Sequence, residues 1–435
     1  MRLRYYAKKN GVASLVNNLS RFLNVGVQGA TLVTRFLFIF FLAKYLDPAL
    51  VGYYGLFIAA VGYSIYFVGL DFYTYVTREI LKAPCEQRGR LLKGQVALSF
   101  FLYLLFLPFI LLFLHYADWP GALLYWFFPI LVLEHFNQEI SRLLIALSEP
   151  VTASIMLFIR QGSWALVIVA LMAWDPASRN LQNVMVLWAT AGFSAAFAGV
   201  WKVQKMHMGG WSESLDWHWI RRGIVVSAAF LLATLALRGV QVFDRYWLEA
   251  IGGIEIVAAY VLFLGVAGTL LTFLDAALFA FTYPALIQLH YEQKVDVAHA
   301  RVKKMLGLTI IISGMFALTS WLLLPYLLLW INNPVYSSAI NLYPLLLLAM
   351  VVSAISMVPH CALYARGYDR PIIYSHIAAL IVFLLATWVF SMHFSAMAVP
   401  IGLNFSFAVI LFWKGIAYMR LRKSDSMLKL ASQTI

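Results

Sequence analysis

Long apolar stretches alternate with short polar segments along the whole chain. A membrane-spanning helix needs about 20 predominantly apolar residues, and the chain offers twelve such stretches. They lie at 23–46, 50–72, 94–115, 122–147, 151–174, 183–203, 223–247, 255–281, 305–330, 339–365, 372–393 and 397–418. The pattern therefore predicts an all-α polytopic membrane protein with twelve transmembrane helices.

The polar segments between these stretches fall into two alternating sets. Lysine and arginine gather at residues 78–93, 202–222, 294–304, 366–370 and 420–429, whereas the intervening segments are short and nearly uncharged. Cytoplasmic loops carry an excess of lysine and arginine. We therefore assign the basic set to the cytoplasm, which predicts that both termini are cytoplasmic.

Composition agrees with a protein that lies mostly within a membrane. Of the 435 residues, 63% are hydrophobic and 12% are charged, whereas a soluble domain carries about 25% charged residues. The formal net charge is +13, which in a soluble protein would suggest nucleic acid. Most of it belongs to the predicted cytoplasmic loops, so nucleic acid is not an expected partner.

Motifs for common enzyme chemistry and for metal binding do not occur in the sequence. It has no P-loop, no GxSxG and no zinc-type spacing of cysteine and histidine. The two cysteines, Cys85 in a predicted cytoplasmic loop and Cys361 in a predicted span, do not suggest a disulfide framework. We expect no enzymatic activity, no metal and no cofactor.

Matches between the two halves indicate an internal duplication. TLVTRF at 31–36 resembles TLALRG at 234–239, which places Arg35 opposite Arg238. Further along, ALSEPVTASI at 146–155 resembles ARGYDRPIIYSHI at 365–377, in the same order and at a similar offset. The polar segment from Gln204 to Arg222 lies between the halves. We therefore predict two six-helix lobes, 1–208 and 209–435.

Three segments carry a resemblance to a known family. They are LAKYLDPALVGYYGLF and GLDFYTYVTRE in the first two predicted spans, and FDRYWLEAI after Arg238. With these segments the chain resembles the polysaccharide-transport branch of the MOP flippase superfamily, the O-antigen and lipid-linked oligosaccharide flippases. It departs from the usual pattern at Lys44, where arginine is common, and it lacks a glycine before Tyr260.

The resemblance implies a MATE-like fold of two lobes around a V-shaped cavity, working by alternating access. It implies an undecaprenyl-diphosphate-linked oligosaccharide, an O-antigen or exopolysaccharide repeat unit, as cargo. This cargo would move from the inner to the outer leaflet of a bacterial inner membrane during polysaccharide or lipopolysaccharide biosynthesis. The implied partners are the lipid bilayer, a polysaccharide polymerase and the chain-length machinery.

Basic residues inside the predicted spans are candidates for binding the diphosphate of such a cargo. Arginine remains protonated and can hold phosphate oxygens in a bidentate manner, and charged residues at membrane depth usually face a bundle interior or a water-filled cavity. The candidate substrate-binding residues are Arg35, Arg238, Arg160, Arg245, Lys44 and the deep acid Glu134. The alternative for each is a structural role, as an ion pair with an internal charge or at the membrane interface.

Acids near the predicted cytoplasmic ends are candidates for coupling transport to Na⁺ or H⁺. They are Asp71, Asp275 and Glu139, and a purely structural role is the alternative for each. His135, Glu139 and Arg142 share one helical face, so Glu139 and Arg142 can pair. The three histidines His360, His376 and His393 are isolated in the sequence, and we interpret them as packed polar or interfacial rings.

Three other functions are compatible with a polytopic membrane protein. A MATE-type multidrug or cation antiporter would need an acid-dominated site, whereas arginine outnumbers acid in the predicted lumen. A membrane glycan polymerase or ligase usually places its chemistry on a long outer loop, and the predicted outer loops are all short. A peptidoglycan-precursor flippase would also need a positively charged cavity, but by resemblance it would have about two further helices.

Overall fold

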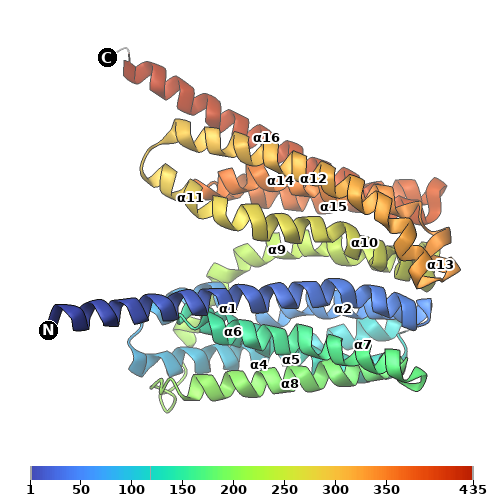
Figure 1. The fold of residues 1–435 in the computed structure, drawn as a ribbon, viewed down its shortest axis with the longest axis horizontal. Coiled ribbons are helices and arrows are strands. Elements are labelled where there is room, and N and C mark those ends of the chain that lie inside the picture. Colours follow the sequence, from blue (N-terminus) through green and yellow to red (C-terminus); the bar gives the residue numbers. More distant parts are fainter. Residues whose placement is uncertain (1, 118, 434–435) are drawn as a thin grey trace. The chain divides into compact units, whose positions relative to one another are not determined.

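The computed structural model describes the backbone of residues 2–117 and 119–433 and the side chains of residues 23–117, 119–228, 231–232 and 234–425. Within these residues every regular element is a helix (Figure 1). The chain divides into two compact units. Unit 1 comprises Met1–Leu46 with Ala60–Leu231, and unit 2 comprises Asp47–Ala59 with Leu232–Ile435. The predicted lobes, 1–208 and 209–435, differ from this division at 47–59 and 209–231 and stay a prediction.

Unit 1 is a bundle of long helices joined by short turns. Its helices are α1 (Arg2–Tyr45), α3 (Tyr73–Lys82), α4 (Cys85–Tyr116), α5 (Gly121–Ala146), α6 (Pro150–Phe158), α7 (Trp164–Trp174) and α8 (Leu181–Gln204). A π-helical turn, η1 (Ile159–Ser163), joins α6 to α7, and a 3₁₀ turn, η2 (Pro176–Ser178), follows α7. Within this unit α1 packs on α6 and α7, and α5 packs on α8.

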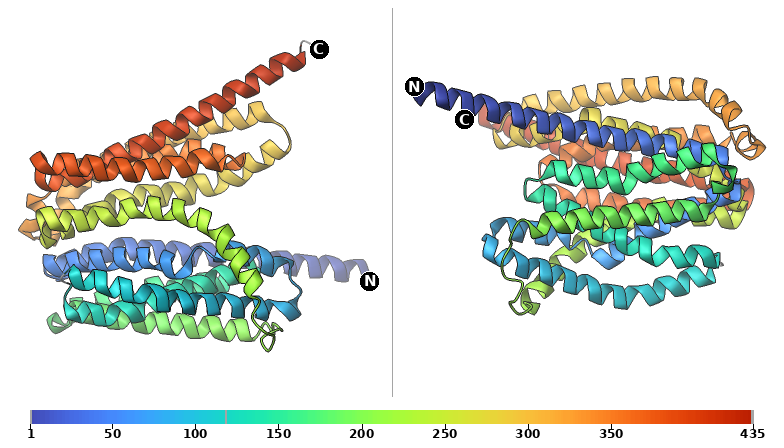
Figure 2. Two further views of the ribbon diagram at one scale, coloured as in Figure 1. Left: turned by 180° about the vertical axis from the view of Figure 1, so that it is seen from behind. Right: turned by 60° about the horizontal axis from the view of Figure 1, so that its bottom comes forward.

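Unit 2 has a similar construction. It contains α10 (Ile254–Leu274), the π-helical η3 (Asp275–Phe279), α11 (Ala280–Tyr291), α12 (Val295–Ile331), α13 (Pro334–Ser338), α14 (Leu342–Ala365), α15 (Asp369–Phe394), η4 (Ser395–Met397) and α16 (Ala398–Gln433). Helix α16 packs on both α14 and α15, and α15 and α16 run side by side in both views of Figure 2. Helices α2 (Pro48–Gly69) and α9 (Trp217–Gly252) contribute residues to both units.

Local sequence signals set several helix ends. Asp47 accepts a hydrogen bond at Oδ1 from the backbone N of Ala49 (2.9 Å), and Pro48 begins α2. Asn180 caps α8 through the backbone N of Asn183 (2.8 Å). At the C-terminal end of α12, Asn332 adopts the left-handed conformation that commonly ends helices. These polar turns explain why the apolar stretches break where they do.

Each of the twelve predicted stretches is helical over most of its length. Nine helical segments within the described residues are long and apolar enough to cross a membrane, and the last of them, Asp369–Asp425, includes both α15 and part of α16. The predicted all-α, multi-pass architecture is confirmed. The count of twelve crossings and the cytoplasmic placement of both termini stay predictions.

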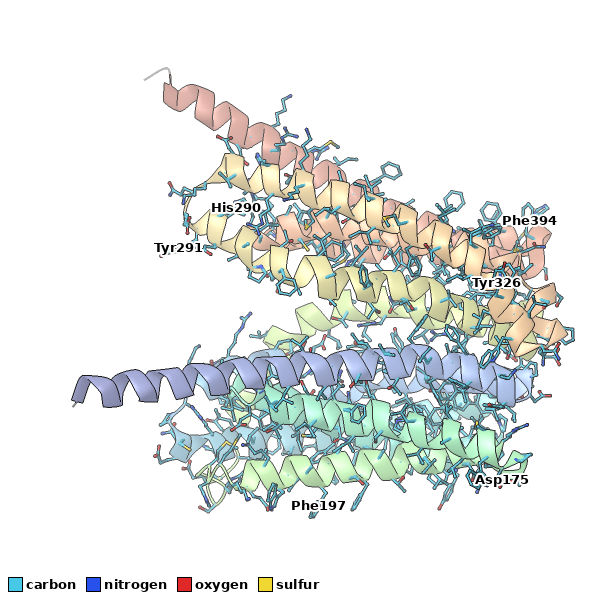
Figure 3. All side chains as sticks on the ribbon, in the orientation of Figure 1. Asp175, Phe197, His290, Tyr291, Tyr326 and Phe394 are labelled. Atoms are coloured by element: carbon cyan, nitrogen blue, oxygen red, sulfur yellow. The ribbon has the colours of Figure 1, made fainter. Side chains whose placement is uncertain are left out.

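The outward faces of the helices are apolar. In the apolar segments of α4 and α12 only 11% and 17% of the residues are buried, so most of their large hydrophobic side chains are exposed. Figure 3 labels two exposed aromatic side chains, Phe197 on α8 and Tyr326 on α12, which project from the ribbon. In water such surfaces would favour aggregation. In a bilayer they meet lipid tails, which agrees with a multi-pass membrane protein.

The polar segment after α8, predicted as a linker, is docked on unit 1. The backbone N of Gly89 donates to the carbonyl of Gly209 (2.8 Å), and the backbone N of Gly209 donates to the carbonyl of Cys85 (3.0 Å). Arg90 forms ion pairs with Glu213 (3.4 Å) and Asp216 (3.5 Å). The segment is therefore held against the start of α4 by both backbone and side-chain contacts.

We predict that Gly89→Ala destabilises this docking. A Cβ at position 89 would lie 2.4 Å from the carbonyl oxygen of Gly209, and neither backbone can yield easily. Alanine favours a helix by about 1 kcal/mol over glycine, but overpacking costs roughly 1–3 kcal/mol. The melting temperature of the detergent-purified protein should therefore fall.

Gly307→Ala is the matched control, because a Cβ on that glycine of α12 would meet no atom within 4 Å. Only the gain in helix propensity remains there, so its melting temperature should stay the same or rise. Equal melting temperatures for Gly89→Ala and the wild type would show that the close approach of Gly89 and Gly209 is unimportant.

Candidate functional site

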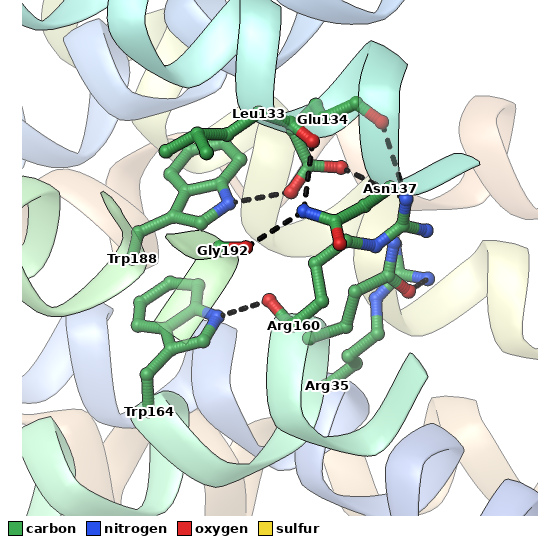
Figure 4. Close-up of polar contacts among 9 residues, drawn as sticks. Arg35, Leu133, Glu134, Asn137, Arg160, Trp164, Trp188 and Gly192 are labelled. Atoms are coloured by element: carbon green, nitrogen blue, oxygen red, sulfur yellow. Dashed lines mark hydrogen bonds and ion pairs between the residues drawn. The ribbon is translucent and has the colours of Figure 1, made fainter. Parts of the chain in front are cut away.

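A polar cluster lies among the apolar helices of unit 1, where α1, α5, η1 and α8 meet (Figure 4). We call it the arginine cluster, and its members are Arg35, Glu134, Arg160, Gln161 and Trp188. Three of them, Arg35, Arg160 and Glu134, were predicted as separate candidates. The structure brings these three together in one place.

Glu134 and Arg160 form the buried part of the arginine cluster. Their relative exposures are 8% and 6%, and Nη1 of Arg160 lies 3.6 Å from Oε2 of Glu134. The same Nη1 donates to the main-chain carbonyl of Glu134 (3.3 Å), while the indole of Trp188 donates to Oε1 of Glu134 (2.8 Å). Both carboxylate oxygens therefore have partners, which is the structural alternative considered for Arg160 and Glu134.

The π-helical turn η1 positions two neighbouring side chains for different partners. Arg160 reaches Glu134, and the next residue, Gln161, accepts a hydrogen bond from Arg35. The indole of Trp164 donates to the main-chain carbonyl of Arg160 (2.8 Å) and stacks on Trp188 with ring centroids 5.6 Å apart. A π turn within a helix often marks a functional site. Here it supports the whole cluster.

Arg35 is the accessible member of the cluster. Its side chain is exposed, and Nη1 donates to Oε1 of Gln161 (2.9 Å). Figure 4 shows it beside Arg160. Its partner is a neutral amide, so the positive charge of Arg35 is not cancelled by this contact. Arg35 can therefore present a guanidinium to an anion, whereas Arg160 is committed to Glu134.

Unit 2 places Arg238 in a comparable setting. Arg238 is exposed on α9, and its Nη1 donates to Oε1 of Gln241 (2.8 Å). The internal duplication pairs Arg238 with Arg35, and both guanidiniums contact a glutamine side chain. Their glutamines differ in origin, because Gln161 lies on another helical segment and Gln241 lies three residues along the same helix.

The remaining basic candidates are less accessible than these two. Arg245 is half-buried and donates to the main-chain carbonyl of Gln241 (3.4 Å). Its neighbour Asp244 is 2% exposed and accepts a hydrogen bond from the hydroxyl of Tyr260 (2.5 Å). Lys44 is half-buried near the end of α1. These positions leave their substrate-binding roles as predictions.

The coupling candidates occupy three different environments. Arg142 pairs with Glu139 (2.6 Å), which confirms the predicted pair, and Gln95 donates to the other carboxylate oxygen (2.5 Å). Asp71 is buried in the turn between α2 and α3, with a positive φ of 49°. Asp275 is exposed and begins the π-helical turn η3. Asp275 is thus the most accessible of the three acids.

A correction concerns two of the three histidines interpreted as isolated. His360 and His376 both contact the ammonium of Lys414, at 3.1 Å and 3.0 Å. The sequence analysis missed Lys414, although a lysine in the middle of the segment LFWKGIAY is a charged residue within a predicted span. The contacts themselves join residues 38 and 54 positions apart, so no local pattern could reveal them.

No protein-family model and no curated protein sequence matches the chain. Solved structures do match it. The inward-facing conformation of a multidrug resistance MATE family transporter of the MOP superfamily has a TM-score of 0.75 at 12% identity, covering 92% of this chain and 99% of that one. The chain has the MATE fold.

Two further structures show the same MATE fold. A mutant of the Vibrio cholerae MATE transporter VcmN has a TM-score of 0.58 at 14% identity, covering 94% of this chain and 98% of its own. A MOP superfamily transporter from Pyrococcus furiosus has a TM-score of 0.59 at 14% identity, covering 93% and 94%. At these identities the likeness is one of fold, and it spans nearly the whole chain.

We predict that breaking the Glu134–Arg160 pair costs stability. Arg160→Met leaves the carboxylate of Glu134 buried without its cation, which should cost about 3–5 kcal/mol. Trp188→Phe keeps an aromatic ring but removes one hydrogen bond to a charged group, which should cost about 1.5–3 kcal/mol. Thermal unfolding of the purified variants measures both losses.

The double variant Glu134→Leu/Arg160→Met is the control for this prediction. It removes both charges together, so it should recover most of the stability that Arg160→Met loses. If Arg160→Met melts like the wild type, the pair does not hold this part of unit 1 together.

Proposed function

We propose that the protein is a flippase for an undecaprenyl-diphosphate-linked oligosaccharide, moving an O-antigen or exopolysaccharide repeat unit from the inner to the outer leaflet of a bacterial inner membrane. The MATE fold supports a transport role, because the solved structures that share it are those of transporters. The observation that carries the proposal is the exposed guanidinium of Arg35, held by the neutral Gln161.

Arg35 lies in the segment of α1 that is long and apolar enough to cross a membrane. An exposed charge at membrane depth is costly unless it faces water or an oppositely charged group. A guanidinium offers five N–H donors, and the contact with Gln161 uses one nitrogen. The remaining donors suit the bidentate binding of phosphate oxygens. A diphosphate that crosses the bilayer with its lipid tail fits this requirement.

The glutamine contacts also favour a binding role over a structural one. Gln161 orients the guanidinium of Arg35 through a neutral amide, and Gln241 contacts the guanidinium of Arg238 in the same way. Arg160 shows the other arrangement within the same protein, because its guanidinium faces a carboxylate. We infer that Arg35 and Arg238 bind the diphosphate and that Arg160 supports the helix carrying Gln161.

The alternative is a MATE-type multidrug or cation antiporter, which the likeness to multidrug resistance transporters favours. A cation site needs accessible carboxylates. Glu134, Glu139 and Asp244 instead accept hydrogen bonds from Trp188, Arg142 and Tyr260. Asp275 is the exposed acid among the coupling candidates. The Pyrococcus furiosus transporter is described as having a binding pocket of reverse polarity that suggests a different function. The MATE fold thus accommodates pockets of differing polarity, and an efflux assay with cationic dyes separates the two functions.

We predict that Arg35→Gln and Arg238→Gln each lower the rate of flipping at least tenfold. This corresponds to the loss of about 1.4 kcal/mol or more of interaction with the diphosphate. The measurement uses proteoliposomes that contain a fluorescent undecaprenyl-diphosphate-linked disaccharide. A membrane-impermeant quencher reports how much of the fluorescent lipid remains in the outer leaflet.

Arg301→Gln is the matched control, because it removes one exposed positive charge from α12 outside the predicted substrate-binding set. It should flip the lipid at the wild-type rate. Equal protein incorporation in all vesicles shows that the variants fold and insert. Wild-type rates in both Arg35→Gln and Arg238→Gln would rule out the proposed role of these guanidiniums, and dye efflux without lipid flipping would favour the antiporter.

A further inference from the structure

Three basic side chains meet inside unit 2, on three adjacent helices. Lys414 lies on α16, His360 on α14 and His376 on α15, and we call them the basic triad. The ammonium nitrogen of Lys414 lies 3.1 Å from Nδ1 of His360 and 3.0 Å from Nε2 of His376. The two imidazole rings are nearly parallel, with centroids 6.4 Å apart. The lysine nitrogen is therefore held between two rings.

Two members of the basic triad are buried among predicted membrane-spanning helices, and His360 is half-buried. Lys414 is 2% exposed and His376 is 8% exposed, although lysine is among the residue types least often buried. Helix α16 packs closely on both α14 and α15, so the triad lies within the most extensive helix packing of unit 2. A lysine in this position needs a physical explanation, because an ammonium loses its hydration there.

In the charged state of Lys414, the hydrogen bonds place the protons as follows. A lysine ammonium has three donors and no acceptor. It therefore donates to the lone pairs of Nδ1 in His360 and Nε2 in His376, and each ring keeps its own proton on the other nitrogen. The charged state of the triad has one ammonium and two neutral imidazoles, with a net charge of +1.

The groups around the basic triad are mostly uncharged. Tyr364 stacks on His360 with centroids 6.0 Å apart, and Tyr283 of α11 stacks on Tyr364 at 5.4 Å. Cys361 follows His360 on α14, and Asp275 of η3 and Lys414 both act on the Cys361 thiol electrostatically. Among the described side chains, no carboxylate lies within ion-pair distance of the Lys414 ammonium.

The energetics of this arrangement favour an exchangeable proton. A buried ammonium without a counter-ion is costly, and two hydrogen bonds to neutral rings offset only part of that cost. The neutral amine removes the buried charge, and its two N–H groups can still donate to the two ring nitrogens. The Lys414 nitrogen can therefore gain or lose a proton without breaking either contact.

We propose that Lys414, His360 and His376 form a proton-binding site in unit 2. In the empty state the triad holds a neutral amine and two neutral imidazoles. One proton from water adds to the lone pair of the Lys414 nitrogen, which raises the charge of the site from 0 to +1. Release returns the proton to water and restores the amine. Under the proposed function this site would supply the proton coupling that the sequence analysis sought among Asp71, Asp275 and Glu139.

The test follows the two histidines directly by ¹⁵N NMR. The full chain, labelled with imidazole-¹⁵N histidine, is placed in lipid nanodiscs without any transport substrate. His360→Gln and His376→Gln identify the two resonances among the nine histidines. We expect both resonances to shift together in one pH-dependent transition, because a proton added to Lys414 changes the hydrogen bonds to both rings. In Lys414→Met this shared transition should disappear.

Two further variants make the result decisive. Lys414→Arg places a permanent charge between the rings, so it should also remove the transition, and it serves if Lys414→Met fails to fold. His393→Gln alters an exposed histidine outside the triad and should leave the transition unchanged. Absence of a shared transition in the wild type, or its persistence in Lys414→Met, would overturn the proposal. Because no substrate is present, failure of the flippase proposal leaves this outcome unaffected.

Discussion

The cost of a charged side chain in hydrocarbon governs the polar contacts of this protein. An unpaired charge at membrane depth is expensive, so such residues pair, accept hydrogen bonds or face water. Glu134 contacts Arg160 and Trp188, and Glu139 contacts Arg142 and Gln95. Glu134 joins α5 to η1 and α8, and Glu139 joins α5 to α4. The polar contacts therefore fix which helix faces meet, in a bilayer where apolar packing alone distinguishes them poorly.

The same constraint makes the accessible charges informative. Arg35 is exposed, and its described hydrogen bond goes to a neutral amide. Lys414 is buried, and both of its described partners are neutral rings. Neither residue has a carboxylate among its described partners. One is open to an external anion, and the other has the alternative of losing its proton.

The sequence predicted those features that depend on local pattern. The lengths of the apolar stretches located the helices, because a helix that crosses a bilayer needs about 20 apolar residues. The Glu139–Arg142 pair followed from i, i+3 spacing on one helix. Hydrogen-bond partners that are far apart in the sequence could not be predicted from local pattern. Gln161 lies 126 residues from Arg35 and Trp188 lies 54 residues from Glu134, so their hydrogen bonds depend on how whole helices pack.

The histidines show how such a miss arises. His360 and His376 are separated in sequence and each looks like a packed ring, because their common partner lies on a third helix. The coupling residues predicted from the sequence were all acids, so Lys414 was not among them. Proton coupling needs a group that binds and releases a proton. A buried base meets this need as well as a buried acid does, since either changes charge when it exchanges a proton.

The character of the membrane-embedded charges also separates the candidate functions. Glu134 and Glu139 each have a cationic partner, and Asp244 accepts a hydrogen bond from Tyr260. The described contacts of Arg35 and Lys414 are with neutral groups. Such a balance suits the proposed passage of an anion at the arginine cluster, where the carboxylate of Glu134 is already engaged. A cation antiporter with this fold would instead depend on an accessible acid, and among the three coupling candidates Asp275 is the exposed one.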